Sequence, residues 1–266
     1  MANTSSSEPM NKAVITLAGG RYLAGAAVQL MELRYLGCEW PYHVFNIPGE
    51  EIPDGYRRFF ARMGVEILEV PDYMGHPWTA KRSAIAQFPD TEVLFLDADN
   101  IPLINPEFIR QDARYQRTGT VFWRDFGTTQ PDHMVWNMLG LEPKVEIEQE
   151  SGQLLIDTGR CAAGLAQLRV WDLNYIEHYK ILHGDKDMWR FAWAKVGLPY
   201  EWGSPDLDFI MDNGGSVRVM IQKWDGHQVF HHRVHSKLSI DGDNFWRVGI
   251  PLRYFEHLEY VKSIVS

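Results

Sequence analysis

The first hundred residues alternate between short apolar runs and longer segments whose apolar residues recur at helical spacing. Short apolar runs bounded by Gly, Pro or Asn are typical of strands, and apolar residues three or four apart are typical of helices. Strands separated by such helices pair in parallel, because only a long crossover returns the chain in the same direction. The pattern therefore predicts a Rossmann-like half with parallel strands. We expect strands at 13–18, 42–46, 65–70 and 93–96, and helices at 23–33, 54–63 and 77–88.

The second half of the chain is less regular. The sequence has no repeat, no low-complexity segment and no clear linker. We therefore expect one α/β domain over residues 11–266, preceded by a disordered polar tail at residues 1–10. In this half we expect strands at 120–123, 153–156 and 217–221, and helices at 171–182 and 186–195.

Two aspartates follow the last strand of the first half. Val93-Leu-Phe-Leu runs directly into Asp97-Ala-Asp99, and Asn100-Ile-Pro102 ends the run. In an open α/β sheet, ligands bind at the carboxyl ends of the strands. Two carboxylates two residues apart can converge on Mg²⁺ or Mn²⁺, which in turn binds diphosphate oxygens. The alternative is a strand end closed by a local Asx turn, with no ligand.

Composition excludes several classes of protein. With a formal net charge of −9 the protein would be repelled by the phosphates of a nucleic acid, so we expect no nucleic-acid partner. Two cysteines, Cys38 and Cys161, imply neither a disulfide framework nor a thiolate zinc site. The polar start lacks the apolar stretch of a signal peptide, and no run approaches the roughly 18 apolar residues of a membrane helix. We therefore expect a cytoplasmic protein without a transmembrane segment.

Four ordered blocks resemble nucleotide-sugar-dependent glycosyltransferases of the GT-A fold. The resemblance is to the fungal-type α-mannosyltransferases and their bacterial relatives, and more distantly to the glycogenin and galactosyltransferase group. It implies a GT-A domain with a mixed, mainly parallel sheet flanked by helices. It also implies transfer of a hexose to a glycan or other hydroxyl acceptor, with retention of configuration. GDP-mannose is the favoured donor and a UDP-hexose the alternative. The blocks are Lys81 to Pro106, Glu150 to Asp157, Gly184 to Trp193, and Val229 to Arg233 with Lys237.

The resemblance assigns the metal and diphosphate ligands. Asp97 and Asp99 would hold Mn²⁺ or Mg²⁺, and a C-terminal histidine would complete the coordination. The family pattern favours His232, with His231 next. Arg233 and Lys237 would bind the diphosphate oxygens. The alternative for these two cations is a solvated basic turn.

The same family places the nucleotide at the end of the first strand. Thr16, Ala18 and Gly19 fall there, and Gly19 would let the ligand approach the backbone closely. Lys81, on the helix that begins at Pro77, would contact the donor. The alternatives are a plain strand-to-helix turn and an exposed lysine.

The remaining polar residues of the matching blocks would face the transferred sugar. Glu150 and Gln153 would stabilise positive charge at the anomeric carbon from the face opposite the leaving group. Asp185 and Asp187 would bind hydroxyls of the sugar. For Asp185 the alternative is a helix N-cap.

Two other classes of protein fit the Asp-x-Asp pattern less well. A phosphohydrolase of the haloacid-dehalogenase type would use the first aspartate as nucleophile, but its motif belongs near the first strand rather than the fourth. A carbohydrate- or nucleotide-binding module without catalysis would have no use for a metal site next to a histidine and basic residues.

Overall fold

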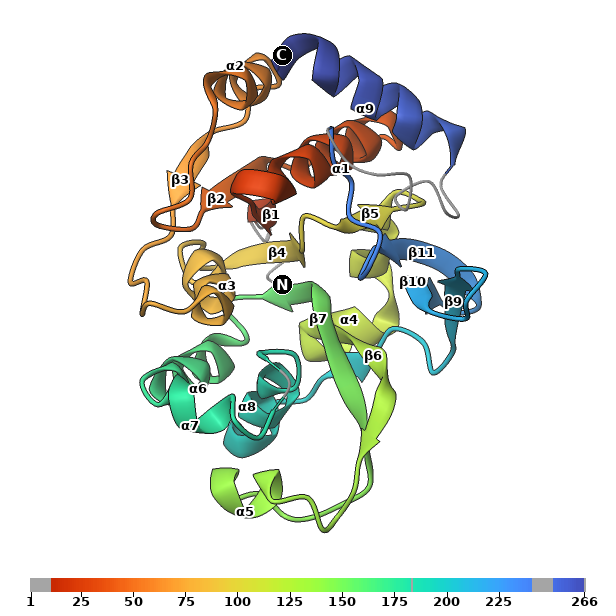
Figure 1. Ribbon diagram of the computed structural model, residues 1–266. Coiled ribbons are helices and arrows are strands. Elements are labelled where there is room, and N and C mark those ends of the chain that lie inside the picture. The colour runs from red at the N-terminus through yellow and green to blue at the C-terminus, as the bar shows by residue number, and fades with distance from the viewer. Residues whose placement is uncertain (1–10, 183, 241–250, 266) are drawn as a thin grey trace, which may run out of the picture.

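The computed structural model describes residues 11–182, 184–240 and 251–265. Figure 1 shows a large central sheet with helices on both faces and a smaller sheet at one side. The disordered tail expected at residues 1–10 lies outside the described residues. Among the described helices, none is long and apolar enough to cross a membrane.

The main sheet has seven strands in the order β3-β2-β1-β4-β7-β6-β8. β1 pairs in parallel with β2 and β4, β2 with β3, and β6 with β8, whereas β7 is antiparallel to both of its neighbours. The expected mixed, mainly parallel sheet is therefore confirmed. Its strands are β1 (Asn11–Leu17), β2 (Tyr42–Asn46), β3 (Ile67–Glu69), β4 (Thr91–Leu96), β6 (Thr120–Thr129), β7 (Glu146–Asp157) and β8 (Glu201–Trp202).

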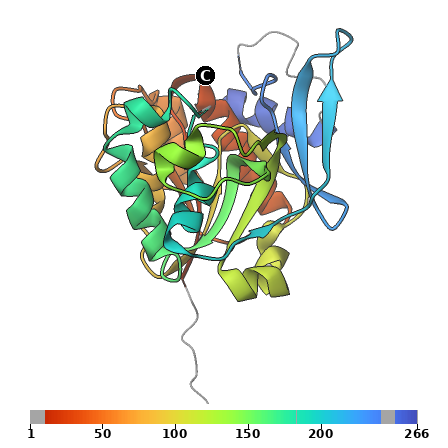
Figure 2. The same ribbon diagram turned by 90° about the horizontal axis from the view of Figure 1, so that it is seen from below.

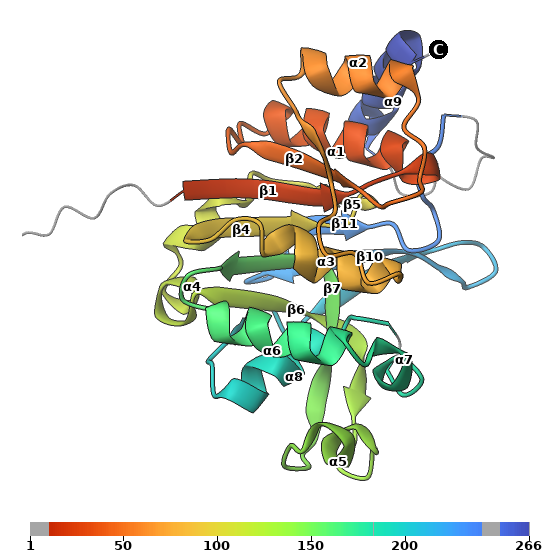
Figure 3. The ribbon, with the colours of Figure 1, turned by 90° about the vertical axis from the view of Figure 1, so that its left-hand side faces the viewer.

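Residues that alternate along the strands point into two separate hydrophobic layers. Val14 and Leu94 pack beneath α1 (Leu23–Tyr35), α2 (Asp54–Arg62) and α9 (Leu252–Val265). Their neighbours Ile15 and Val93 belong to the opposite layer. This period of two is what buries both faces of a central sheet. The second layer is covered by α3 (Pro77–Ile85), α6 (Ala162–Asp172) and α8 (Met188–Val196), and Figure 3 shows α3 and α6 in front of the strands.

A smaller antiparallel sheet has the order β5-β11-β10-β9. Its strands are β5 (Asn100–Pro102), β9 (Leu207–Met211), β10 (Val217–Trp224) and β11 (His227–His232). β5 begins directly after the Asp97–Asp99 pair, and β11 pairs with it so that His232 lies opposite Asn100. In Figure 2, β9 and β10 extend away from the main sheet. The pairing of β5 with β11 brings the C-terminal part of the chain to the aspartates.

The expected helix at 171–182 is wrong. α6 ends at Asp172, and a separate one-turn helix, α7, covers Tyr175–His178. Asp172 is buried and accepts a hydrogen bond from Arg82 of α3 at 2.6 Å. This contact holds the end of α6 against α3, while the exposed Leu173 and Asn174 turn the chain away. Tertiary packing therefore overrode the local helical pattern.

Four short helical segments complete the described part of the chain. They lie in the connections that follow β1, β5 and β6, and their lengths fit short connections. They are η1 (Gly20–Tyr22), η2 (Pro106–Gln111), α4 (Ala113–Thr118) and α5 (Val135–Leu139).

Candidate functional site

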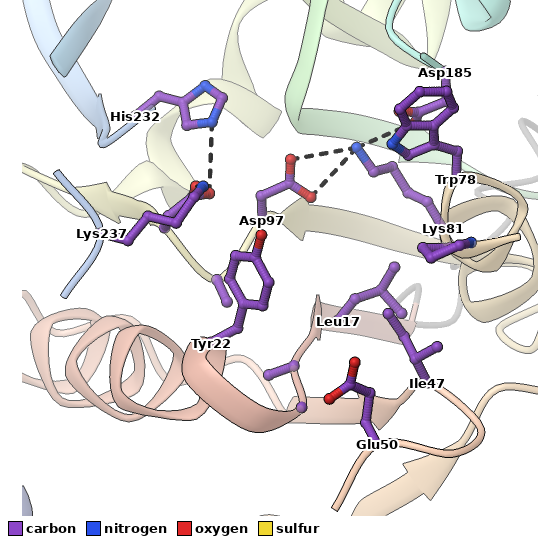
Figure 4. Close-up of a pocket in the computed structure, with 15 residues that line it drawn as sticks. Leu17, Tyr22, Ile47, Glu50, Trp78, Lys81, Asp97, Asp185, His232 and Lys237 are labelled. Carbon is purple, nitrogen blue, oxygen red and sulfur yellow. Dashed lines mark hydrogen bonds and ion pairs between the residues drawn. The ribbon is translucent and has the colours of Figure 1, made fainter. Parts of the chain in front are cut away.

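A cavity of about 350 Å³ lies at the carboxyl ends of β1, β2 and β4. One part of its wall is apolar and is formed by Leu17, Ile47, Pro77 and Trp78. The other part carries charged groups, which Figure 4 shows pointing toward one another. This position agrees with the rule for ligand sites in open α/β sheets. The charged lining residues are Glu50, Lys81, Asp97, Asp99, Asp185, His232 and Lys237.

Asp97, Asp99 and His232 form a candidate metal site. One ligand atom from each residue lies within 4.8 Å of the other two. The Asp99 and His232 side chains are nearly buried, and that of Asp97 is 31% exposed. Nε2 of His232 is 3.5 Å from Oδ1 of Asp99. Two carboxylates and one imidazole are a donor set suited to Mn²⁺ and to Mg²⁺ with additional water.

The lining of the cavity carries more negative than positive charge. Four carboxylates, those of Asp97, Asp99, Asp185 and Glu50, line the cavity with two ammonium groups, those of Lys81 and Lys237, and with His232, whose imidazole is neutral when it binds a metal. An added divalent cation would offset this imbalance in a partly dehydrated site. The residues present therefore fit a divalent metal.

The two aspartates differ in their electrostatic environment. Burial would raise the pKa of Asp99, but His232 and Lys237, which forms an ion pair with it, outweigh burial and hold that pKa well below its usual range. Burial raises the pKa of Asp97, and the Lys81 ammonium only partly opposes it. Asp99 is thus held as a carboxylate by its cationic neighbours.

His232 is held between two carboxylates. Nδ1 of its imidazole is 3.5 Å from Oε1 of Glu150, on the side opposite Asp99. Burial disfavours the charged imidazolium, but Glu150 and Asp99 outweigh burial and raise the pKa of His232 to about 9. A Cβ at Gly152 would come 2.8 Å from Cε1 of His232, so only glycine leaves room for the ring there. Glu150 therefore orients His232, as carboxylates commonly do for metal-binding histidines.

The backbone of the aspartate turn is fixed by a buried amide from α1. Nε2 of Gln29 donates to the carbonyl oxygens of Asp97 and Asn100 at 2.8 and 2.6 Å. Nδ2 of Asn100 donates to the carbonyl oxygen of Gly152 at 2.9 Å. One turn before Gln29, Gly25 has no side chain, and α1 packs directly on the carbonyl of Ala98. The sequence analysis missed both Gln29 and Gly25, although a lone polar residue in an Ala-rich helix was a usable signal.

Lys81 links the metal site to Asp185. Its ammonium is 3.3 Å from Oδ1 of Asp97 and 3.2 Å from Oδ2 of Asp185, and it donates to the carbonyl and hydroxyl oxygens of Ser151. Although burial lowers the pKa of Lys81, these carboxylates raise it further than burial lowers it. Ser151 and Trp189 also donate to Oδ2 of Asp185. Within the described ranges, Oδ1 of Asp185 accepts no hydrogen bond and can face a ligand.

Asp187 does not reach the cavity. Its Oδ1 accepts hydrogen bonds from the backbone of Gln149 at 2.9 Å and from Nε of Arg190 at 2.7 Å, and the residue is 3% exposed. It also occupies the N-cap position of α8, where Asp185 was the candidate. Of the two aspartates expected to bind the sugar, Asp185 therefore lines the cavity and Asp187 does not. The chain before α8 directs the Asp185 side chain to the cavity and the Asp187 side chain to Gln149 and Arg190.

Glu150 and Gln153, on β7, also lie outside the lining of the cavity. Oε1 of Glu150 accepts from the backbone of Gly152 at 2.7 Å. Gln153 is fully buried, and its Oε1 accepts from Asn100. Both side chains therefore contact residues around the candidate metal site and do not line the cavity, where the sequence analysis had expected them.

Arg233 and Thr16 are likewise buried outside the cavity. Nε of Arg233 donates to the carbonyl oxygen of Ser236 at 2.7 Å, and its backbone donates to the carbonyl oxygen of Asp99. Its guanidinium therefore stabilises the turn that follows β11 and does not reach the lining. Ala18, Gly19 and Lys237, by contrast, line the cavity as expected.

Neither His231, the second candidate, nor the nearby His235 joins the candidate metal site. His231 points to the opposite side of β11, with its ring 6.5 Å from that of Tyr254. Burial lowers the pKa of His231 to about 4. His235 is exposed. The strand period of two therefore selects His232, since adjacent side chains on β11 face opposite ways.

The sheet order, the crossover helices and the metal site at the end of β4 define a glycosyltransferase domain of the GT-A fold. The galactosyltransferase LgtC, solved with donor and acceptor sugar analogues, superposes with a TM-score of 0.61 at 16% identity over 96% of each chain. The glycosyltransferase GlyE of Streptococcus pneumoniae TIGR4 has a TM-score of 0.51 at 16% identity. That match covers 73% of this chain and 45% of GlyE.

The sequence identifies the family within this fold. The chain belongs to the family described as "Mannosyltransferase putative", whose model matches residues 12–149, just over half of its length. It is also similar to the α-1,2-mannosyltransferase MNN22 of Candida albicans, with 27% identity over 133 residues. The match covers 44% of this chain and 22% of the Candida protein, so the chain spans only part of that relative's length.

Proposed function

We propose that the protein is a metal-dependent glycosyltransferase that moves a mannosyl group from a nucleotide sugar to a hydroxyl group of a glycan or small acceptor. GDP-mannose is the favoured donor, and a UDP-hexose is the alternative. The family and the fold support the class of reaction. The observation that carries the proposal is the convergence of Asp97, Asp99 and His232 at the charged end of a cavity whose other wall is apolar.

Asp97, Asp99 and His232 would hold Mn²⁺ or Mg²⁺ in this proposal. The cation would neutralise charge on the nucleoside diphosphate as it leaves the sugar. Lys237 lies beside Asp99 and faces the cavity, so its ammonium can also bind diphosphate oxygens. Lys81 is fixed by Asp97, Asp185 and Ser151, so it holds the two carboxylates in place.

Asp185 is the residue placed to hold the transferred sugar. Its carboxylate lines the cavity and pairs with Lys81, and no described residue donates a hydrogen bond to Oδ1. A carboxylate accepts hydrogen bonds from sugar hydroxyls and can stabilise positive charge that develops at the anomeric carbon. Retention of configuration follows the resemblance and belongs to the proposal.

The test is a screen of nucleotide sugars with the intact protein. We expect Mn²⁺-dependent release of nucleoside diphosphate, loss of that release in Asp99→Ala and Asp99→Asn, and reversible inhibition by EDTA. Asp132→Ala removes an exposed carboxylate outside the cavity and is the matched control. Thermal unfolding should show that the Asp99 variants remain folded. Full activity of Asp99→Asn in the presence of chelator would contradict the metal site, and release of phosphate from monoesters would indicate a phosphohydrolase.

A further inference from the structure

A tight turn after β2 brings a carboxylate to the apolar part of the cavity. In the segment Ile47-Pro48-Gly49-Glu50, the backbone of Glu50 donates to the carbonyl oxygen of Ile47 at 3.0 Å. Gly49 has a φ of +92°, which together with Pro48 indicates a type II turn. Asn46 donates to the carbonyl oxygen of Glu50 at 3.1 Å. The position of Glu50 is therefore set by the backbone of the turn.

The side chain of Glu50 lies over two glycines at the end of β1. A Cβ at Gly19 would come 2.6 Å from Cβ of Glu50, and a Cβ at Gly20 would come 2.9 Å from its Oε2. Real Cβ atoms do not approach this closely, so the Glu50 side chain uses space that any other residue at position 19 would fill. The turn that carries Glu50 can therefore pack on the end of β1 because residues 19 and 20 have no side chains.

The carboxylate of Glu50 sits apart from the metal site. Figure 4 shows Glu50 and Ile47 across the cavity from His232 and Lys237. Figure 4 shows Tyr22 and Leu17 between these two pairs, and Ala18 and Trp78 also line the cavity. A nucleoside diphosphate bound to the metal would extend along this wall, with its flat base against the apolar side chains and the edge of the base toward Glu50.

We propose that Glu50 accepts hydrogen bonds from N1–H and the N2 amino group of guanine and thereby selects a guanosine diphosphate sugar. An ionised carboxylate is an acceptor only, with two adjacent oxygens. Guanine presents two adjacent donors on that edge. Uracil presents one N–H between two carbonyl oxygens, and adenine presents one amino group beside a ring acceptor. Only guanine pairs with both oxygens of Glu50.

The inference rests on the proposed function and adds the residue that distinguishes a guanine from a uracil nucleotide. A hydrogen bond to a charged group changes affinity by about ten- to a hundred-fold. We therefore expect GDP to bind at least about ten-fold more tightly than UDP. Inosine diphosphate (IDP) keeps N1–H but lacks the N2 amino group, so its affinity should fall between the two.

The experiment is calorimetry of the full chain with GDP, IDP and UDP in the presence of Mn²⁺. Glu50→Gln replaces the acceptor pair by one acceptor and one donor, which suits uracil better than guanine. We expect this variant to bind GDP about ten-fold or more weakly than the unmodified protein does, and to bind UDP equally or more tightly. The ratio of GDP affinity to IDP affinity should fall. Glu51→Gln changes the neighbouring exposed carboxylate, which does not line the cavity, and should leave all three affinities unchanged.

The outcomes separate this inference from the proposed function. Equal weakening of GDP and UDP in Glu50→Gln would overturn the inference and place the carboxylate on the ribose hydroxyls. Tighter binding of UDP than GDP by the unmodified protein would also overturn it. In both cases the metal-dependent transferase stands. If none of the three diphosphates binds in the presence of Mn²⁺, the proposed function itself is refuted.

Discussion

Replacing Gly25 by alanine should displace the backbone turn that carries Asp97 and Asp99. Gly25 lies in α1, and a Cβ there would be 2.3 Å from the carbonyl oxygen of Ala98 and 3.1 Å from its carbon. Ordinary contact between such atoms begins near 3.4 Å. The distance from this Cβ to the Ala98 oxygen is therefore about 1 Å shorter than an ordinary contact. Because the opposing atoms are backbone, either α1 or the turn from Asp97 to Asn100 must move by roughly that distance.

The expected cost follows from two opposing effects. Within a helix, alanine is normally more stable than glycine by about 0.5 to 1 kcal/mol. Overpacking a well-filled interior typically costs about 1 to 3 kcal/mol. We expect Gly25→Ala to lower the free energy of unfolding by about 1 to 2 kcal/mol. A displacement of about 1 Å at reacting groups can cost about a hundred-fold in rate, so turnover and Mn²⁺ affinity should both fall at least ten-fold.

The assay compares Mn²⁺-dependent donor binding and turnover with thermal stability. Val261→Ala, in the buried face of α9, should lower the Tm by a similar amount but leave Mn²⁺ affinity and turnover unchanged. This control separates general destabilisation from displacement of the turn. A Gly25→Ala protein with a higher Tm and unchanged Mn²⁺ affinity would refute the reasoning.

Two further predictions concern charged residues. Asp185→Asn should weaken binding of the intact donor and leave binding of free nucleoside diphosphate nearly unchanged. Asp187→Asn removes one of the two carboxylates that pair with the buried Arg190, so it should chiefly lower the Tm. The opposite pattern in calorimetry and thermal unfolding would restore Asp187 as the sugar contact. Arg253→Ala should lower the free energy of unfolding by about 1.5 kcal/mol at pH 7, because Arg253 pairs with the fully buried Glu32. Burial would raise the pKa of Glu32, but His257 and Arg253 hold it below 4.5. Their contribution to stability is therefore present above pH 4.5 and lost as the pH falls through the lowered pKa, so urea titrations should show a larger effect of Arg253→Ala at pH 7 than at pH 3.

The sequence by itself determined the parallel half of the sheet and the place of the aspartate pair. Both depend on short-range patterns, because strand and helix periods are local and the polar residues after a buried strand lie at its end. The expected strands 42–46 and 93–96 and the helix from Pro77 agree with β2, β4 and α3. The resemblance added His232, which local pattern alone did not distinguish from His231.

Only the tertiary structure decided which polar residues face the cavity. Asp185 and Asp187 lie two residues apart in one matching block, yet one lines the cavity and the other pairs with Arg190. Glu50 carries no motif, and it reaches the cavity only because a turn folds it over Gly19.

The physical reason is that side-chain direction and partners depend on contacts distant in sequence. The register of β11 on β5 places His232 beside Asp99 from 133 positions away, and a strand shifted by one residue would have presented His231. Gln29 reaches the aspartate turn across about 70 positions by the packing of α1. Local periodicity therefore determines where the strands and helices lie in the sequence and which edge of the sheet binds a ligand. The packing of these strands and helices determines which residues form the site.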